Sequence, residues 1–286
     1  MKPASFAYHA PTTIEEAVAL LARVGPQDGR ILAGGQSLVP IMNFRLASPG
    51  HLIDINGIED LRKVREDRNE LIVPACVRHA AFEMPVTAGP LGQLMTAVVQ
   101  HIAHHPIRTR GTFCGSLAHA DPASEWCLVA ATLDATIVAR SARGLRDIPV
   151  TDFFAGIMTT TLAPDELLVE ARLPLLAQGS RFGFYEVSRR AGDFAMAMAL
   201  AVYTLDSGKI AEPRLGVGGA EGRPRRIPEA EAILAGKAPT AEIFELAAQA
   251  AAGALTDVLE DARSTAAFRR DLVRAAVNRA LERSVP

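Results

Sequence analysis

The stretch Ala33-Gly34-Gly35-Gln36-Ser37-Leu38-Val39-Pro40 lies near the N-terminus of this 286-residue chain and decides how its first part folds. The run 30–33 before it predicts a short buried strand. The segment 38–46 after it is typical of a helix, with Ser37 as its N-cap and Pro40 tolerated in its first turn. A strand that turns on two glycines into a helix leaves backbone N–H groups unobstructed, at the positive end of the helix dipole. Such a turn suits an anion such as a phosphate.

A plain strand-to-helix turn is the alternative for this stretch, because it has neither the Rossmann nor the Walker pattern of glycines. Just upstream, Thr13 and Glu16 have the spacing of a capping box, and apolar residues then recur at helical period. The order is therefore helix, strand, glycine turn and helix.

A second stretch with glycines and hydroxyls runs from Arg108 to Glu125. Glycines and hydroxyls suit phosphate oxygens, and a carboxylate such as Glu125 suits sugar hydroxyls. Two such loops in one domain predict a dinucleotide. An ordinary loop, capped by Asp121 onto a helix that begins near Pro122, is the alternative. We expect residues 107–122 to be irregular, because they show little periodicity.

Around these loops the patterns predict an α+β fold. Strands are expected at 51–55 and 70–75, in short runs between 135 and 173, and as an antiparallel set at 182–188, 197–205 and 210–216. Helices are expected at 91–104, where Pro106 would end the helix, and at 243–252 and 266–282. A domain boundary is expected near 175–179.

Composition and charge exclude several classes of protein. Apolar residues make up 49% of the chain and charged residues 22%, which is ordinary for a globular protein and unlike disorder. A net charge of −2 provides no field to hold nucleic acid or an anionic membrane. The segment 1–11 lacks the apolar region of a signal peptide, and the apolar run 195–205 is shorter than the ~20 residues that cross a bilayer. The cytoplasm is the expected location.

The residue types that carry metal or nucleophilic chemistry are not arranged for it. Three cysteines without CxxC spacing encode neither a disulfide framework nor a zinc site, and they are too few for an iron–sulfur cluster held by four thiolates. His101, His104 and His105 lack a nearby carboxylate or cysteine that would complete a metal site. No Ser-His-Asp or Cys-His arrangement has convincing local context. We therefore expect no metal site and no catalytic residue in this chain.

Taken together, the two loops resemble a known family. The sequence is similar to the medium, FAD-binding subunits of the molybdenum hydroxylases, the family of bacterial carbon monoxide dehydrogenase and xanthine dehydrogenase. Residues 33–40 match its first flavin motif, AGG[HQ]SLxP, throughout. Residues 112–116 are a degenerate version of its second motif, TIGGN, with Cys114 in place of a glycine, Ser116 in place of the asparagine and Phe113 in place of the isoleucine; residues 117–125 then fit the LAxADPxxE-like continuation. The similarity covers essentially the whole chain.

The resemblance implies a fold and a set of FAD-binding residues. It implies a two-subdomain FAD-binding region of the PCMH type at 1–176, with subdomains of about 1–56 and 57–176. A C-terminal flavoprotein domain with a small antiparallel sheet and helices would follow at 177–286. The residues it places at the pyrophosphate and adjoining ribityl region are Leu32, Ala33, Gly34, Gly35, Gln36, Ser37, Leu38, Thr112, Cys114, Gly115, Ser116 and Ala118. It places Ser124 and Glu125 near the adenosine ribose, and Leu168, Val169 and Phe194 around the isoalloxazine.

The resemblance also implies a division of labour among subunits. A large subunit would hold a molybdopterin cofactor and hydroxylate the substrate, and a small subunit would carry two two-iron two-sulfur clusters. This chain would hold FAD, take electrons from those clusters and pass them to an external acceptor, within a heterotrimer or a dimer of heterotrimers. Two other functions stay open at this point. One is a self-sufficient FAD-dependent oxidoreductase with its own small substrate, and the other is a noncatalytic scaffold in which the glycine loops are only turns.

Overall fold

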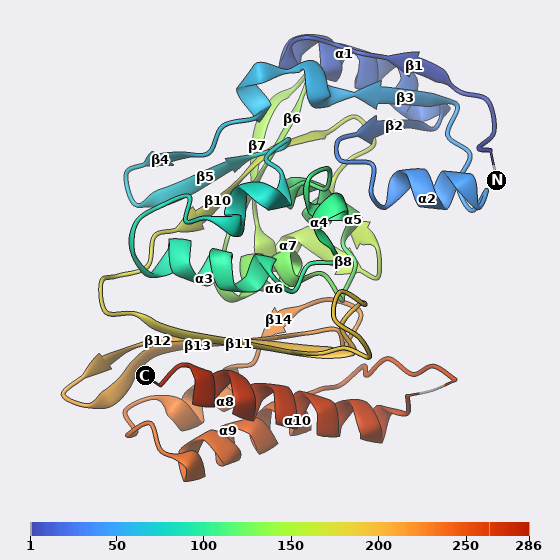
Figure 1. Cartoon of the computed structure of the whole chain (residues 1–286). Coiled ribbons are helices and arrows are strands. Elements are labelled where there is room, and N and C mark those ends of the chain that lie inside the picture. The colour runs from blue at the N-terminus through green and yellow to red at the C-terminus, as the bar shows by residue number, and fades with distance from the viewer. Residues whose placement is uncertain (1, 263, 286) are drawn as a thin grey trace.

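The computed structural model describes residues 2–262 and 264–285. Met1 and Pro286, the outer ends of the two predicted domains, lie outside the described residues. The chain forms three tiers (Figure 1): a small sheet with one helix, a larger sheet with several helices, and a third sheet covered by the C-terminal helices. No helix in the described ranges is long and apolar enough to span a membrane.

The first tier is a three-stranded parallel sheet with the order β1-β3-β2, and helix α1 packs against it. At the start of α1 the Thr13 side chain accepts a hydrogen bond from the N–H of Glu16, and the Glu16 carboxylate accepts one from the N–H of Thr12. The Thr13 bond is the N-cap half of the capping box that the spacing predicts, whereas the Glu16 carboxylate reaches one residue further back, to Thr12. The bounds are β1 (Ala7–His9), α1 (Ile14–Val24), β2 (Gly29–Leu32), α2 (Leu38–Asn43) and β3 (His51–Asp54).

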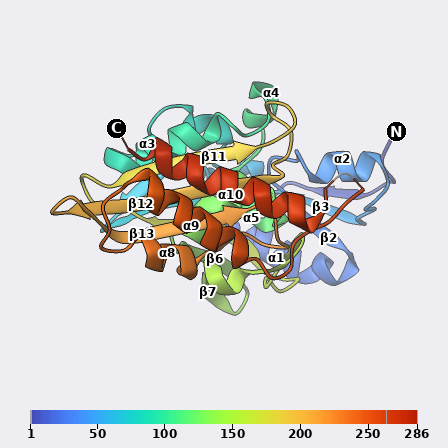
Figure 2. The ribbon, with the colours of Figure 1, turned by 90° about the horizontal axis from the view of Figure 1, so that it is seen from below.

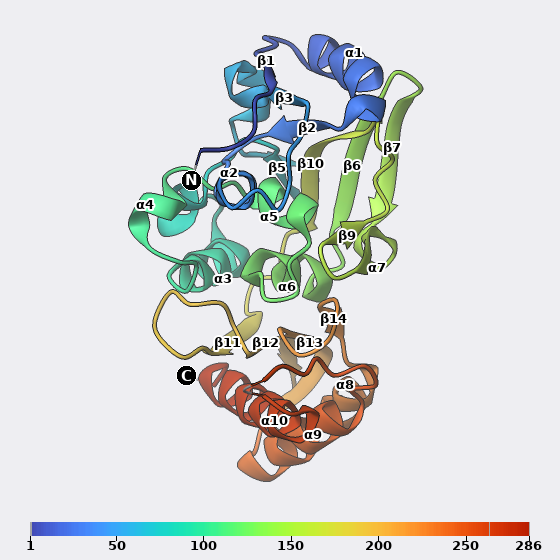
Figure 3. The same ribbon diagram turned by 90° about the vertical axis from the view of Figure 1, so that its right-hand side faces the viewer.

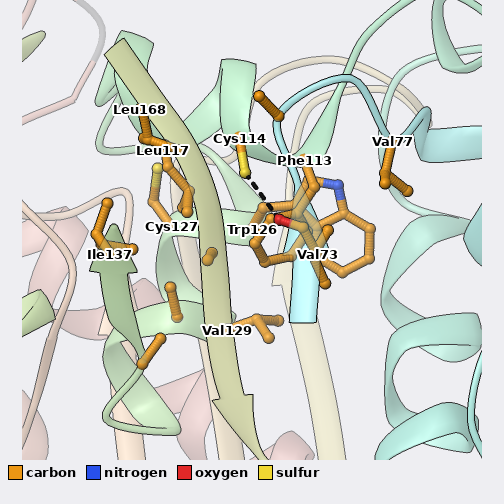
Figure 4. Close-up of a cluster of buried hydrophobic side chains, with 14 of the residues drawn as sticks. Val73, Val77, Phe113, Cys114, Leu117, Trp126, Cys127, Val129, Ile137 and Leu168 are labelled. Atoms are coloured by element: carbon orange, nitrogen blue, oxygen red, sulfur yellow. Dashed lines mark hydrogen bonds between the residues drawn. The ribbon is translucent and has the colours of Figure 1, made fainter. Parts of the chain in front are cut away.

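The second tier is a five-stranded antiparallel sheet with the order β4-β5-β10-β6-β7. Its strands are β4 (Arg65–Asp67), β5 (Glu70–Pro74), β6 (Thr136–Ser141), β7 (Gly144–Pro149) and β10 (Leu167–Pro174), and a small pair is formed by β8 (Phe154–Gly156) and β9 (Thr159–Thr160). Its helices are α3 (Gly89–Val99), α4 (His105–Arg108), α5 (Phe113–His119), α6 (Glu125–Thr132) and α7 (Val150–Phe153). The fully buried Trp126 and Phe113 lie at the centre of this core (Figure 4), where they contact one another and Phe82.

The third tier is a four-stranded antiparallel sheet with the order β11-β12-β13-β14. Strand β12 is buried on both faces, because Leu200 belongs to the core shared with the second tier and Ala199 to the core under the helices. Figure 2 shows α10 and α9 lying across this sheet, and Figure 3 shows α3 and α6 on its other side. The bounds are β11 (Arg181–Val187), β12 (Ala197–Asp206), β13 (Lys209–Gly218), β14 (Arg225–Arg226), α8 (Pro228–Leu234), α9 (Ala241–Gly253) and α10 (Ala266–Arg283).

Most predicted elements are present, and the region after residue 99 is where the local prediction is wrong. The helix expected at 91–104 is α3, which begins at Gly89 and ends at Val99, and Ala103 then adopts a positive φ of 43° that no helix continues through. Pro106 lies in the first turn of α4 and so starts a helix instead of ending one.

The stretch 107–122 also differs from the irregular loop that we expected. It contains the second half of α4 and all of α5, which begins because the Thr112 side chain accepts a hydrogen bond from the N–H of Gly115. The helix expected near Pro122 begins at Glu125, and the Asp121 carboxylate accepts from the N–H of Ala123 within the preceding turn. The helix expected at 38–46 ends at Asn43, and Ser37 precedes it without a side-chain capping bond.

Gly183 tests how closely α10 is seated on β11. A β-carbon at this position would overlap the carbonyl oxygen of Ala280, which is backbone and cannot rotate away. We expect Gly183→Ala to lower the free energy of unfolding by about 1–3 kcal/mol, the usual cost of overpacking. Gly156→Ala is the matched control, because it too places alanine in a strand but has nothing within 4 Å of the added carbon. Denaturant unfolding measures both, and equal stabilities would contradict this packing.

Candidate functional site

The two glycine loops meet at one cavity of about 390 Å³ between the first and second tiers. The cavity takes residues from β2, the turn before α2, and the segment that leads into α5. Eleven of the predicted site residues line it, and these are Leu32, Ala33, Gly34, Gly35, Gln36, Ser37, Leu38, Thr112, Gly115, Ser116 and Ala118. Segments about 80 residues apart in the sequence therefore line the same cavity.

The two loops lie against each other at Gly34. A β-carbon on Gly34 would lie 2.5 Å from the carbonyl oxygen of Arg110 and 2.7 Å from the α-carbon of Gly111. Only glycine allows this approach, because both obstacles are backbone atoms. Gly35 has a φ of +71°, in the left-handed region that glycine adopts without strain. The paired glycines therefore serve different purposes, one for close approach and the other for the turn.

Arg78 and Asn56 tie the loops together. The side-chain amide of Asn56 donates to the carbonyl of Ala33 in the first loop at 2.7 Å, and its oxygen accepts from the Arg78 guanidinium at 2.5 Å. The same guanidinium donates to the carbonyl of Arg110 in the second loop. Asp54 fixes Asn56 by accepting from its backbone N–H at 2.9 Å. This Asn56–Arg78 brace sets the distance between the two walls of the cavity.

The first loop offers donors that the rest of the chain does not use. The backbone N–H groups of Gly34, Gly35, Gln36 and Ser37 have no hydrogen-bond partner within the described ranges. Gly34, Gly35 and Gln36 are only partly exposed, and unpaired donors in partly buried backbone are costly unless a ligand accepts from them. A run of such donors beside two glycines fits a phosphate group. The residues therefore fit the dinucleotide that the sequence predicts.

His79 is a cavity residue that the sequence patterns did not single out. Its backbone N–H donates to the carbonyl of Gly111 at 2.9 Å, and its ring is buried beside Trp126. Burial, with the charges of Arg108 and Arg78, lowers the pKa of His79 to about 3. Nothing local marks this residue, because it lies 29 or more positions from either loop. The other lining residues missed at the sequence level are Arg30, Ile31, Ile41, Gly111, His119 and Met158.

Three of the predicted isoalloxazine contacts and one predicted loop residue lie outside this lining. Cys114 points into the core and its thiol donates to the carbonyl of Val73 at 3.3 Å (Figure 4), so its side chain does not obstruct the cavity. Leu168 and Val169 are buried in β10. Phe194 is 77% exposed in the connection between β11 and β12. Flavin contact by these four residues stays a prediction.

Glu125 and Ser124 also lie outside the lining, at the start of α6 where the second and third tiers meet. Glu125 is buried and interacts with Glu186 of β11, whose side chain is 2% exposed. Burial raises the pKa of both carboxyls, and the neighbouring Glu186 adds to the rise at Glu125. His101 lies 3.9 Å from Glu186, and its pKa is lowered by burial and by Arg283. Ribose binding by Ser124 and Glu125 stays a prediction.

The histidines after α3 diverge in the structure. His101 faces Glu186, whereas His105 lies 3.2 Å from Glu83. Within residues 2–262 and 264–285, no group of three or more histidine, cysteine or acidic side chains is placed to hold a metal ion.

Fold and cavity together define a class: a two-domain protein whose paired glycine loops meet at one cavity. Comparison with known proteins then identifies the family. Residues 4–176 match the FAD-binding domain in molybdopterin dehydrogenase, and residues 183–284 match the carbon monoxide dehydrogenase flavoprotein C-terminal domain. The chain therefore belongs to the family of medium, FAD-binding subunits of the molybdenum hydroxylases, which are oxidoreductases, and it carries their FAD-binding domain.

Relatives of this chain match over its full length. It is 38% identical to the 6-hydroxypseudooxynicotine dehydrogenase complex subunit alpha of Paenarthrobacter nicotinovorans, over 100% of this chain and 96% of the relative. It is 37% identical to caffeine dehydrogenase subunit beta of Pseudomonas sp. (strain CBB1), over 99% and 96%. Its fold matches a solved structure of carbon monoxide dehydrogenase from Hydrogenophaga pseudoflava with a TM-score of 0.94 at 35% identity, covering 99% of this chain and 98% of that one.

The raised carboxyl pKa values predict a pH dependence of stability. A carboxyl that stays protonated in the folded state but ionises in the unfolded chain makes the folded state bind more protons, so its contribution to the free energy of unfolding falls with a downward slope as pH rises from about 4.5 to about 8, whereas the lowered pKa of His79 contributes an opposite slope below about pH 6.5. We expect Glu125→Gln to flatten the downward slope, because glutamine cannot ionise. The exposed Glu229→Gln is the control and should leave the slope unchanged. Denaturant unfolding across this pH range would refute the assignment if the Glu125→Gln slope matched that of the parent protein.

Proposed function

We propose that this chain is the FAD-binding electron-transfer subunit of a heterotrimeric molybdenum hydroxylase. In this proposal it takes electrons from two-iron two-sulfur clusters of a small subunit and passes them to an external acceptor. The observation that carries it is the pair of glycine loops braced side by side, with four unpaired N–H groups at one cavity. Bound FAD would supply the conversion between one-electron and two-electron transfer.

The chain's own residues account for binding and orientation of the flavin. Gly34 and Gly35 bring the backbone donors to the diphosphate, and Thr112, Gly115 and Ser116 form the opposite wall. The Asn56–Arg78 brace holds these walls at a constant separation. Because the braced loops are preorganised, little conformational entropy is lost when the dinucleotide binds.

The rest of the reaction is assigned to partner subunits. This chain has only three cysteines, and all three are buried, with Cys76 and Cys114 donating to backbone carbonyls of their own domain. A molybdopterin-binding large subunit and an iron–sulfur small subunit would complete the complex. Related proteins are named as medium chains or subunits of nicotine, caffeine and carbon monoxide enzymes. These enzymes act on very different substrates but have a similar medium subunit. This similarity supports a subunit that does not itself bind the organic substrate.

Gly35→Asp tests the placement of the phosphate cradle. The variant puts a carboxylate beside the unpaired N–H groups, where it would repel the diphosphate and compete for its donors. We expect purified wild-type protein to carry noncovalent FAD with a flavin absorbance band, and Gly35→Asp to lose most of it. Gly179→Asp is the matched control, because Gly179 also has a positive φ, of +83°, and no atoms lie within 4 Å of the added carbon. Full flavin occupancy in Gly35→Asp would overturn the placement.

A comparison of the isolated chain with the complex tests the division of labour. FAD on the isolated chain is expected to remain oxidised when nicotine, caffeine or carbon monoxide is added, and metal analysis should find no stoichiometric iron. When the chain is co-purified with the products of neighbouring genes, metal analysis of the complex should find iron and molybdenum. Absorbance at the flavin band reports reduction. Reduction of the isolated, iron-free chain by a small substrate would favour the self-sufficient flavoenzyme instead.

A further inference from the structure

The ring of His79 is held in one tautomer by Trp126. The indole N–H of Trp126 donates to Nδ1 of His79 at 2.9 Å, and an indole nitrogen can only donate. Nδ1 therefore acts as an acceptor and carries no proton. In a neutral imidazole the proton must then be on the other nitrogen, Nε2.

The surroundings of His79 keep the ring neutral. It is 5% exposed, and Arg78 and Arg108 oppose a further positive charge beside them. Trp126 is fully buried and packs against Phe82 and Phe113, so the donor that selects the tautomer cannot easily move. The ring is therefore prepared as a neutral donor with a defined direction.

The Nε2 atom of His79 lies against the second loop, beside Gly111. A β-carbon on Gly111 would lie 2.5 Å from Nε2, so the ring is seated against the backbone of that loop. Both residues line the cavity. Nε2 makes no hydrogen bond within residues 2–262 and 264–285, although the other ring nitrogen and the backbone N–H of His79 both have partners. A buried donor without a protein acceptor at the lining of a cavity is a place for a ligand oxygen.

We propose that His79 is a flavin-binding residue, whose Nε2–H donates to an oxygen of the FAD diphosphate, and that Trp126 is the positioning residue that fixes its tautomer. This inference rests on the proposed function, because it takes FAD as the occupant of the cavity. A phosphate oxygen is the fitting acceptor, because His79 bonds to Gly111, and Gly34 of the phosphate-binding first loop packs against that same glycine.

The tautomer can be tested without any ligand. Nitrogen-15 NMR of protein labelled at histidine distinguishes the two neutral tautomers, and His79 is assigned as the signal that disappears in His79→Gln. We expect Nε2 protonated and Nδ1 unprotonated at neutral pH in the FAD-free protein. In Trp126→Phe we expect a mixture of both tautomers. A proton on Nδ1 in the wild-type protein would overturn the proposal.

A pair of amide variants tests the donor itself. Glutamine places its NH₂ group near the position of Nε2, whereas asparagine reaches only the position of Nδ1. We expect His79→Asn to weaken FAD binding by about 10- to 100-fold, the effect of losing a hydrogen bond to a charged group, and His79→Gln to retain most of the affinity. Affinity is measured by titration of flavin fluorescence, with riboflavin, which has no phosphate, as the second probe. Riboflavin affinity should be the same in both variants.

Trp126→Phe separates the tautomer from general packing. It removes the indole N–H but keeps an aromatic ring, and we expect FAD binding to weaken by about two- to tenfold. Phe82→Leu is the matched control, because Phe82 is equally buried in the same cluster but gives no hydrogen bond to His79. Phe82→Leu should leave FAD affinity and the tautomer unchanged.

The outcomes for this inference and for the proposed function are distinct. Wild-type protein that binds no FAD would refute the proposed function. Wild-type protein that binds FAD while His79→Asn binds it equally well would refute only the role of His79. Equal losses in His79→Asn and His79→Gln, or parallel losses for riboflavin, would show that the ring only fills space. If thermal unfolding shows that Trp126→Phe does not fold, the wild-type tautomer together with the FAD affinities of His79→Asn and His79→Gln still decides the matter.

Discussion

The guanidinium of Arg78 holds the two loops of the cavity together, and the rest of the site depends on that contact. Through Asn56 it reaches the carbonyl of Ala33, and directly it reaches the carbonyl of Arg110. A multidentate, charge-assisted contact is stronger and more directional than single neutral hydrogen bonds. The close approach at Gly34 then becomes possible, because both walls are fixed before any ligand arrives.

The third tier supports this site through a sheet that is buried on both faces. Strand β12 packs towards α6 on one side and towards the C-terminal helices on the other. Helix α6 carries both Trp126, which orients His79, and Glu125, which meets Glu186 of β11. The contact between the second and third tiers is thus connected to the cavity through the short helix α6. A continuous apolar strand such as β12 follows from that double burial, since neither face meets water.

Local signals in the sequence predicted most of the helices and strands, but only part of the candidate site. The capping box of α1, the strand before the glycines and the antiparallel hairpins of the third tier were predicted, because each depends on neighbours in the chain. Helix α5 was missed because it is only seven residues long, so its buried residues Phe113, Cys114 and Leu117 give too short a pattern to show a helical period. The end of α3 was misplaced because Pro106 was interpreted as a stop, whereas it lies in the first turn of the next helix.

By itself the sequence determined that two glycine-containing turns exist, that the fold is α+β and that the chain resembles a flavin-binding subunit. The spacing of residues along one chain encodes these features, since turns, caps and hydrophobic periods are local. Only the tertiary structure decided that the two turns line one cavity, that Arg78 and Asn56 join them, and that Trp126 donates to Nδ1 of a histidine in the same lining, His79. Those facts depend on contacts between residues more than 20 positions apart, and the direction of a hydrogen bond across such a distance is fixed only when the core packs.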